Sequence, residues 1–272
     1  SNFVGKSAFA SVNLIMPYLM GISALGFMIG TGGSAFVSKT LGEGKKKLAN
    51  QYFSMLVTIA AIGGFVLSVL SFIFMRRIVM AFGAAGDLID YCTLYGRISC
   101  ISLTAFMLQN VFQSFFVAAG KPQLGLKVIV AAGCTNIVLD ALFIGVLHFG
   151  IAGAALATMT SEFIGVCSVV YFFRKNDSLL HFVKPVFDRR VFLKTCTNGS
   201  SELMTNLSMS LVNALYNLQL MKIAGENGVA AYGAVMYVNF IFVATFLGYA
   251  IGCAPVISYH YGAGNHAELK SV

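Results

Sequence analysis

The chain has 272 residues, of which 58% are hydrophobic and 10% are charged, and its formal net charge is +8. Soluble domains carry about 25% charged residues, so this composition excludes an ordinary soluble protein and indicates one embedded in a membrane. The lysines and arginines fall in short groups between long apolar segments and form no continuous basic tract. Nucleic acid is therefore not an expected partner.

Seven apolar segments follow one another along the chain, and each can cross a bilayer as a helix of about 20 residues. Four long stretches contain no charged residue, and the stretch 128–173 contains only Asp140 and Glu162. Residues 148–153 divide that stretch into two helices. We predict helices at 8–38, 48–75, 96–119, 123–147, 151–173, 195–221 and 227–260. Because these runs lack the alternation of barrel strands, the predicted fold class is all-α, a polytopic membrane protein.

The charges between the helices predict the orientation of the chain. Of the 18 lysines and arginines, 13 fall in one set of alternate loops, which contains Lys45, Lys121, Lys184 and Lys270. The other set contains 5, so the positive-inside rule places the first set in the cytoplasm. The longest polar segment, 174–194, belongs to this cytoplasmic set.

A signature near the start of the chain recurs near its end. The segment 25–30, LGFMIG, matches 247–252, LGYAIG, and each is followed by a serine and a Gly-x-Gly turn: Ser38 with 42–44, and Ser258 with 262–264. The offset between the copies is 222 residues at first and 220 after a two-residue deletion. Six helix-to-helix steps separate the copies, so both cross in the same direction, as parallel repeats of six helices do.

The repeat predicts two lobes and an intact protein of twelve helices, of which this chain holds the second to the eighth. The expected parts are an N-terminal lobe without its first helix (1–173), a cytoplasmic inter-lobe linker (174–194) and the start of a C-terminal lobe (195–272). Each copy contains a GxxxG motif, Gly26/Gly30 and Gly248/Gly252, which lets helices pack closely in lipid.

Three groups of motifs resemble the multidrug and toxic compound extrusion (MATE) family. The first is 29–35, IGTGGSA, with 41–44, LGEG, which is similar to the second helix of that family. The others are 136–140, NIVLD, with 150–155, GIAGAA, and 229–233, VAAYG, with 261–264, YGAG. Their order and spacing match helices two to eight of the family's twelve, over essentially the whole chain.

The resemblance implies a V-shaped pair of six-helix lobes in the plasma (inner) membrane. It also implies a secondary antiporter, not an enzyme, that exports small organic cations in exchange for Na⁺ or H⁺ by alternating access. The expected partners are then the exported cations and the lipid bilayer, the expected state is a monomer, and no cofactor is expected beyond the coupling ion.

Asn136, Asp140 and Thr158 are predicted to converge in the outer half of the first lobe. Asp140 lies seven residues before the helix end at Leu147, and Thr158 lies seven residues after the helix start at Ile151. Equal depth on consecutive antiparallel helices lets both face one pocket, with Asn136 one turn from Asp140. An ionised carboxylate in hydrocarbon costs at least ~2.5–3.5 kcal/mol, so Asp140 needs a compensating role.

Oxygen ligands of this kind suit Na⁺, and a desolvated carboxyl group can instead bind and release a proton near neutral pH. The resemblance implies that Asn136, Asp140 and Thr158 bind the coupling cation, together with an Asp on the first helix. Asn136 and Thr158 could equally form an interhelical hydrogen bond.

Two further acids are candidates. Glu162 lies one turn after Thr158 and could join the cation site, although the resemblance does not extend to it and a packing role is equally open. Glu202 shares one helical face with Asn206, and that face should line the central cleft. The resemblance implies that an acid at this point couples to cations or contacts substrate in one branch of the family, whereas an isolated helix-packing acid is the alternative.

Three other functions compete with an exporter. A lipid-linked oligosaccharide flippase of the same superfamily would need basic residues clustered in the cleft, and the predicted spans contain none at depth. A seven-helix receptor or retinal protein leaves the repeat unexplained, and the last apolar segment, 227–265, has no lysine for retinal. An intramembrane enzyme would need a buried catalytic cluster, but the histidines lie in loops or at helix ends.

Overall fold

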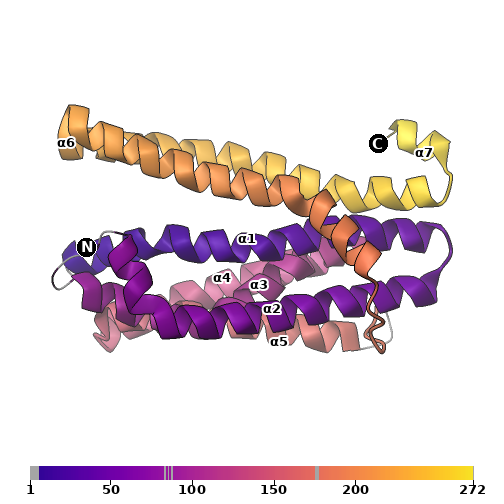
Figure 1. Ribbon diagram of the computed structural model, residues 1–272, viewed down its shortest axis with the longest axis horizontal. Coiled ribbons are helices and arrows are strands. Elements are labelled where there is room, and N and C mark those ends of the chain that lie inside the picture. The colour runs from indigo at the N-terminus through magenta and orange to yellow at the C-terminus, as the bar shows by residue number, and fades with distance from the viewer. Residues whose placement is uncertain (1–5, 83, 85, 87, 175–177, 272) are drawn as a thin grey trace.

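The computed structural model describes residues 6–82, 84, 86, 88–174 and 178–271, and every regular element in them is a helix (Figure 1). In chain order the elements are α1 (Lys6–Gly42), α2 (Lys46–Ala81), α3 (Leu88–Ala118), α4 (Pro122–Asp140), the π-helical segment η1 (Ala141–Val146), α5 (Gly150–Arg174), α6 (Arg189–Gly262) and α7 (His266–Ser271). The predicted all-α class is confirmed.

Helices α1 to α5 form a bundle in which the helix axes are roughly aligned, and α6 lies along one side of this bundle (Figure 1). Helix α1 is the central element, because it packs against α2 and α3 on one side and against α6 on the other. The predicted helix over 123–147 matches the span Pro122–Val146. Within this span, regular α-helix ends at Asp140 and continues as the π-helical segment η1.

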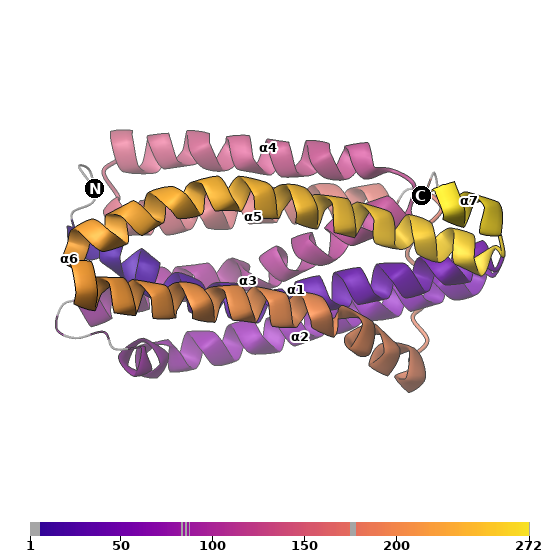
Figure 2. The ribbon, with the colours of Figure 1, turned by 90° about the horizontal axis from the view of Figure 1, so that it is seen from above.

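Helix α6 reverses its direction although its helical hydrogen bonding runs from Arg189 to Gly262. The Tyr232 hydroxyl donates to Asn213 Oδ1 at 2.9 Å, and the Tyr216 and Tyr232 rings stack with centroids 5.3 Å apart. In a straight helix, 19 residues of separation would correspond to about 28 Å. The element is therefore a hairpin with a first arm, 189–216, and a second arm, 232–262, which lie side by side in Figure 2.

Six segments of the described chain are long and apolar enough to cross a membrane. They are Leu14–Gly42, Lys46–Ala81, Leu88–Ala118, Pro122–Val146, Gly150–Tyr171 and Ile241–Gly262. The predicted span 195–221 is helical within α6 but is not among the six, because Glu202, Asn206 and Asn213 lower its hydropathy. A helix this polar needs other helices around it rather than lipid.

The first GxxxG motif packs α1 tightly against α3. A Cβ on Gly26 would lie 2.7 Å from the Met107 carbonyl oxygen, and one on Gly30 would lie 3.0 Å from Val111 Cα. The equivalent glycines of the second copy, Gly248 and Gly252, have nothing within 4 Å of such a Cβ. The two copies share a sequence pattern, but only the first has its packing partner in the described residues.

Glycines also bring α1 into contact with both arms of α6. A methyl group on Gly32 would overlap the backbone carbonyl of Thr195 on the first arm, and a methyl group on Gly42 would overlap the carbonyl of Tyr259 on the second arm. The relation is reciprocal, since Gly199 meets the Met28 carbonyl and Gly262 meets the Lys39 carbonyl. Gly42 and Gly262 occupy equivalent places in the two sequence copies, so this contact joins corresponding ends of the repeats.

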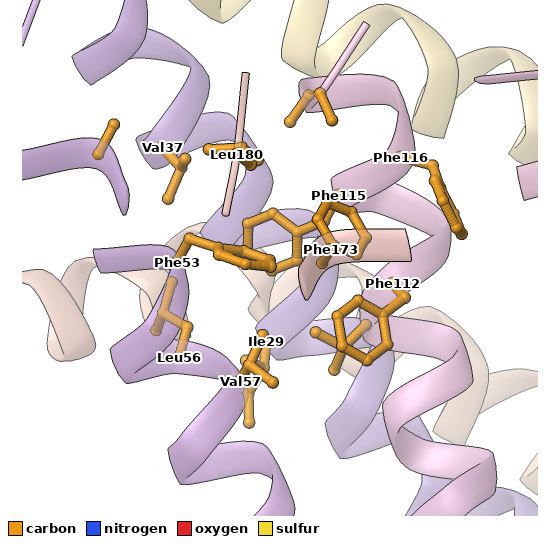
Figure 3. Packing of buried hydrophobic residues seen from close by; sticks show 14 of the residues in the cluster. Ile29, Val37, Phe53, Leu56, Val57, Phe112, Phe115, Phe116, Phe173 and Leu180 are labelled. Atoms are coloured by element: carbon orange, nitrogen blue, oxygen red, sulfur yellow. The ribbon is translucent and has the colours of Figure 1, made fainter. Parts of the chain in front are cut away.

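An aromatic cluster forms the core at this end of the bundle (Figure 3). Phe53 of α2 is fully buried, and its ring centroid lies 5.0 to 5.1 Å from the ring centroids of Phe115, Phe173 and Phe182. Phe112 and Phe173 stack at 5.5 Å. Aromatic pairs at such distances add stability beyond their buried area. The cluster therefore ties α2, α3 and α5 to the segment that contains Phe182.

That segment, 178–188, is docked on α2 by backbone hydrogen bonds to side chains. Asn50 Oδ1 accepts from the His181 amide at 3.0 Å, and Ser54 Oγ accepts from the Val183 amide at 2.9 Å. Leu180 is fully buried. Asp188 then caps α6 by accepting from the amides of Arg190 and Val191. The predicted linker thus lies partly in the core of the first bundle, and helix resumes at Arg189 rather than at 195.

Candidate cation and substrate sites

The structure brings Asn136 of α4 and Thr158 of α5 together. The Asn136 amide donates to Thr158 Oγ1 at 3.4 Å, so the equal depth inferred from the sequence is realised in the fold. Asp140 lies one turn further on, at the last residue of α4, where η1 begins. Segments of π-helix often occur at functional sites, and the sequence did not predict this one.

Asp140 is incompletely satisfied. Its Oδ1 atom is buried and has no hydrogen-bond partner in the part of the chain that the structure describes. A buried acceptor without a donor loses its hydration and gains nothing in return. The oxygen is therefore available to a cation or a proton.

Glu162 stands in a second polar environment next to the first. Its carboxyl group is hydrogen-bonded to the Ser102 side chain, while Oε2 is buried and unpartnered among the described residues. The group lines a cavity of about 170 Å³ between α1, α3 and α5. Thr158 lines the same cavity, and the other lining residues are Met16, Leu19, Met20, Tyr95, Ser99, Ser102, Leu103 and Phe106.

Tyr95 lies close to both acids. Its side chain lines the Glu162 cavity, and its hydroxyl is within electrostatic range of the Glu162 and Asp140 carboxyl groups, which belong to different helices. Thr158 likewise belongs to both environments, since it bonds Asn136 and lines the Glu162 cavity. The four predicted residues of the first lobe therefore form one neighbourhood, and Tyr95 is a member that sequence reasoning missed because a lone tyrosine in an apolar helix carries no signal.

Glu202 and Asn206 lie on the first arm of α6, and both are partly buried. The Asn206 amide donates to the backbone carbonyl of Glu202 at 2.8 Å. This bond is local to the helix, so the amide does not hold the Glu202 carboxylate. The two residues share a face, as predicted, but the hydrogen bond joins Asn206 to the backbone of Glu202 and not to its carboxylate.

The two arms of α6 enclose a larger cavity of about 490 Å³. Its lining residues from the first arm are Met204, Thr205, Ser208, Met209, Val212 and Asn213, and those from the second arm are Tyr232, Met236 and Asn239. The two groups of lining residues come from arms that are separated by the reversal of the helix. Their approach depends on the reversal of α6, which no local pattern reports.

A family model identifies the chain from its sequence. The MatE model matches residues 1–142 and 203–272, which is most of the chain. The chain belongs to the MatE family. The resemblance to multidrug and toxic compound extrusion proteins is thereby confirmed, and the chain is part of a multi-pass membrane transporter. A seven-helix receptor does not fit this membership.

Curated relatives of this MatE chain include the multidrug export protein MepA of Staphylococcus haemolyticus (strain JCSC1435). The two are 26% identical over 264 residues, which is 96% of this chain and 58% of that protein. The chain therefore spans less than two thirds of the length of the relative that it matches.

The helices of this chain can be compared with those of two solved MATE structures. A structure described as the outward-facing conformation of a multidrug resistance MATE family transporter is 24% identical and has a TM-score of 0.88, covering 98% of this chain and 60% of that one. One described as an inward-facing conformation is 25% identical and has a TM-score of 0.79, covering 98% and 61%. This MatE chain therefore has the fold of these transporters over nearly its whole length.

Proposed function

We propose that this MatE chain is part of a cation-coupled antiporter that exports lipophilic organic cations across the plasma membrane. The observation that carries the proposal is the pair of buried carboxyl oxygens in the first lobe, Asp140 Oδ1 and Glu162 Oε2, which lack hydrogen-bond partners among the described residues. Two acids in apolar surroundings are costly unless they bind a counter-charge, and a coupling ion supplies it.

The sign of the charge favours a cation as the transported or coupled species. No lysine or arginine is among the described residues that line the Glu162 cavity, so an anionic group would meet an uncompensated carboxylate there. This disfavours the alternative of a lipid-linked oligosaccharide flippase. The name of the MepA relative, a multidrug export protein, supports export as the direction of transport.

In the proposed mechanism, Asp140 holds Na⁺ or H⁺ together with Asn136 and Thr158. The hydrogen bond from Asn136 to Thr158 orients the threonine oxygen, and Asp140 stands where regular α-helix changes to η1, a kind of position that often serves function. Glu162 serves as a second acceptor for the coupling cation, connected through Thr158 and Tyr95. Neutralising either acid removes its need for a counter-charge and so favours a rearrangement of the helices.

The α6 cavity is the proposed contact surface for the exported compound. Met204, Met209 and Met236 present adaptable sulfur-containing side chains, and Tyr232 presents an aromatic ring that is stacked on Tyr216. Such groups bind flat hydrophobic cations through dispersion and cation–π contacts. Glu202 and Asn206, on the same arm, would attract the positive charge of the compound toward this surface.

The proposed coupling can be tested with charge-neutral variants of the protein at its full natural length. Asp140→Asn and Glu162→Gln keep the shape of each side chain and remove its charge, and Asp90→Asn is the matched control, because Asp90 is exposed at the start of α3. The purified proteins are reconstituted into vesicles, and transport of a fluorescent lipophilic cation is driven by an imposed Na⁺ or pH gradient. Asp140→Asn should abolish and Glu162→Gln should strongly reduce gradient-driven transport, while Asp90→Asn should transport normally.

Equal transport by Asp140→Asn and Asp90→Asn would refute the role of Asp140. Circular dichroism and monodisperse elution in detergent confirm that each variant is folded, so that a lost activity reports on charge. The gradient that drives transport in the unmodified protein distinguishes Na⁺ from H⁺ as the coupling ion.

A further inference from the structure

A cavity of about 300 Å³ lies where α1 meets both arms of α6. Lys39 lines it from the last turn of α1 and Lys194 lines it from the beginning of the first arm. Its other lining residues are Ala35, Phe36, Asn198, Ile257, Ser258 and Tyr261. The cavity therefore collects two ammonium groups, an amide, an aliphatic hydroxyl and a phenol from three helical segments that are far apart in the sequence.

The charges of this cavity are not balanced by acids. No carboxylate is among the residues that line it, and neither Lys39 nor Lys194 forms an ion pair with an acid in the described part of the chain. The acid that interacts with the charge of Lys39 is Glu43, which is already bound to Lys45 at 2.8 Å. The hydrogen bond from Lys45 holds the pKa of the Glu43 carboxyl below its usual range, so this acid is ionised and engaged elsewhere.

The position of Lys39 keeps its charge at the cavity. Its ammonium lies 5.2 Å from the centroid of the Tyr261 ring, and a cation–π contact of this kind restricts a flexible side chain. Two like charges in one recess repel each other, and the repulsion is strongest where solvent is partly excluded. A bound anion relieves it and receives hydrogen bonds from groups that are all able to donate.

We propose that this cavity binds a phosphate-bearing anion, either the headgroup of an anionic phospholipid or soluble phosphate, and that the anion joins α1 to both arms of α6. Phosphate oxygens accept several hydrogen bonds at once, which matches the lysine, amide and hydroxyl donors. The cavity also lies at the ends of α1 and the second arm, where a headgroup would meet the polypeptide. Basic side chains in this position attract anionic lipid.

The site has a conformational consequence. Lys39 belongs to the predicted N-terminal lobe, and Lys194 is the last residue of the predicted linker, which the structure places in the first arm of α6. The contact of Gly42 with Tyr259 closes the same end of the molecule. An anion held by both lysines is bound best when α1 and α6 touch, so it shifts the equilibrium toward that arrangement. The anion would therefore act as a regulator of the transporter, independently of the exported compound.

The test measures binding and needs no transport. The protein at its full natural length is purified in a neutral detergent and titrated, by calorimetry, with dioctanoyl phosphatidylglycerol, dioctanoyl phosphatidylcholine or inorganic phosphate. The test variant is Lys39→Gln/Lys194→Gln. The matched control is Lys46→Gln/Lys47→Gln, which removes two exposed charges at the start of α2 outside the cavity. A third variant, Lys39→Arg/Lys194→Arg, keeps the charge and the ability to bind phosphate.

Phosphatidylglycerol should bind the unmodified protein, the control and the arginine variant with similar affinity. Its affinity for the glutamine test variant should be lower by a factor of about ten or more, because the loss of each hydrogen bond to a charged group lowers the affinity by about that factor. Phosphatidylcholine, whose own cation balances its phosphate, should not compete. Tight, lysine-dependent binding of inorganic phosphate would support the site with a soluble anion as its occupant. Two results would overturn the proposal. One is equally weakened binding in the test variant and the control, since binding would then reflect general surface charge. The other is unchanged binding in the test variant.

Discussion

The contact between α1 and the first arm of α6 depends on a glycine, and Gly32→Ala is the sharpest perturbation of it. A Cβ at this position would overlap the carbonyl oxygen of Thr195 and would lie 2.7 Å from the Gly199 nitrogen. Both are backbone atoms, so no change of side-chain rotamer can relieve the overlap. The two helices must move apart to accommodate a single methyl group.

The size of the effect follows from the packing. Overpacking of a close contact costs about 1–3 kcal/mol. Alanine also favours the helix over glycine by about 1 kcal/mol, but residue 32 remains helical whether or not α1 touches α6, so this gain cancels between the two arrangements. A bias of 1–3 kcal/mol corresponds to a factor of about 5–150 in their ratio. We expect Gly32→Ala to depopulate the arrangement described here by that factor.

The expected shift can be measured as a distance distribution. Spin labels are attached through unnatural amino acids at positions 47 and 265, where Lys47 and Asn265 are exposed at the end of the molecule at which α1 meets the second arm. Double electron–electron resonance then measures the distances between the two labels, and the short-distance fraction gives the share of molecules in which this end is closed. Gly63→Ala is the control, because a Cβ on Gly63 of α2 meets nothing within 4 Å.

Gly32→Ala should lose much of the short-distance population that Gly63→Ala retains. If the two variants give the same distribution, the close approach of Gly32 to Thr195 does not control the separation of α1 and α6, and the steric reasoning is wrong.

Two further predictions concern the linker and the second lobe. Asn50→Ala removes the acceptor of the partly buried His181 amide. This change should lower the stability by about 1–3 kcal/mol and expose 178–188 to a protease. The neighbouring Gln51→Ala is the control, and equal cleavage of both variants would contradict the docking. Glu202→Gln should weaken the binding of a cationic dye more than that of a matched neutral dye, because only the cationic dye interacts with the carboxylate. Fluorescence titration of the purified protein measures both affinities. Equal loss of affinity for both dyes would assign Glu202 a structural role.

Helix positions were predictable because a membrane demands long apolar segments. The predicted helix 48–75 lies within α2, and 151–173 lies within α5. The ends differ by up to about eight residues, since amphipathic turns such as those around Arg76 and Arg189 continue the helix beyond its apolar part. The π-helical segment after Asp140 was not predicted, because its hydrogen-bond register leaves no trace in composition.

Part of the candidate site was also predictable. The pairing of Asn136 with Thr158 followed from equal depth on neighbouring antiparallel helices, and the two side chains meet at 3.4 Å. The partners of Glu162 were not predictable, because Ser102 and Tyr95 come from α3, which is not adjacent to α5 in the chain. Depth along a helix can be counted from a sequence, but rotation of a helix about its axis depends on packing.

The sequence by itself determined that the chain crosses a membrane, that its two copies of one signature run in the same direction, and which acids lie inside apolar helices. These are consequences of the hydrophobic length of each segment and of the order of the segments. Only the tertiary structure decided that Gly26 and Gly30 hold α3 while Gly248 and Gly252 stand open, that 178–188 is docked on α2, and that Lys39 and Lys194 share one cavity. Each of these contacts joins residues far apart in the chain, and their energies depend on distances of a few ångströms that no local pattern encodes.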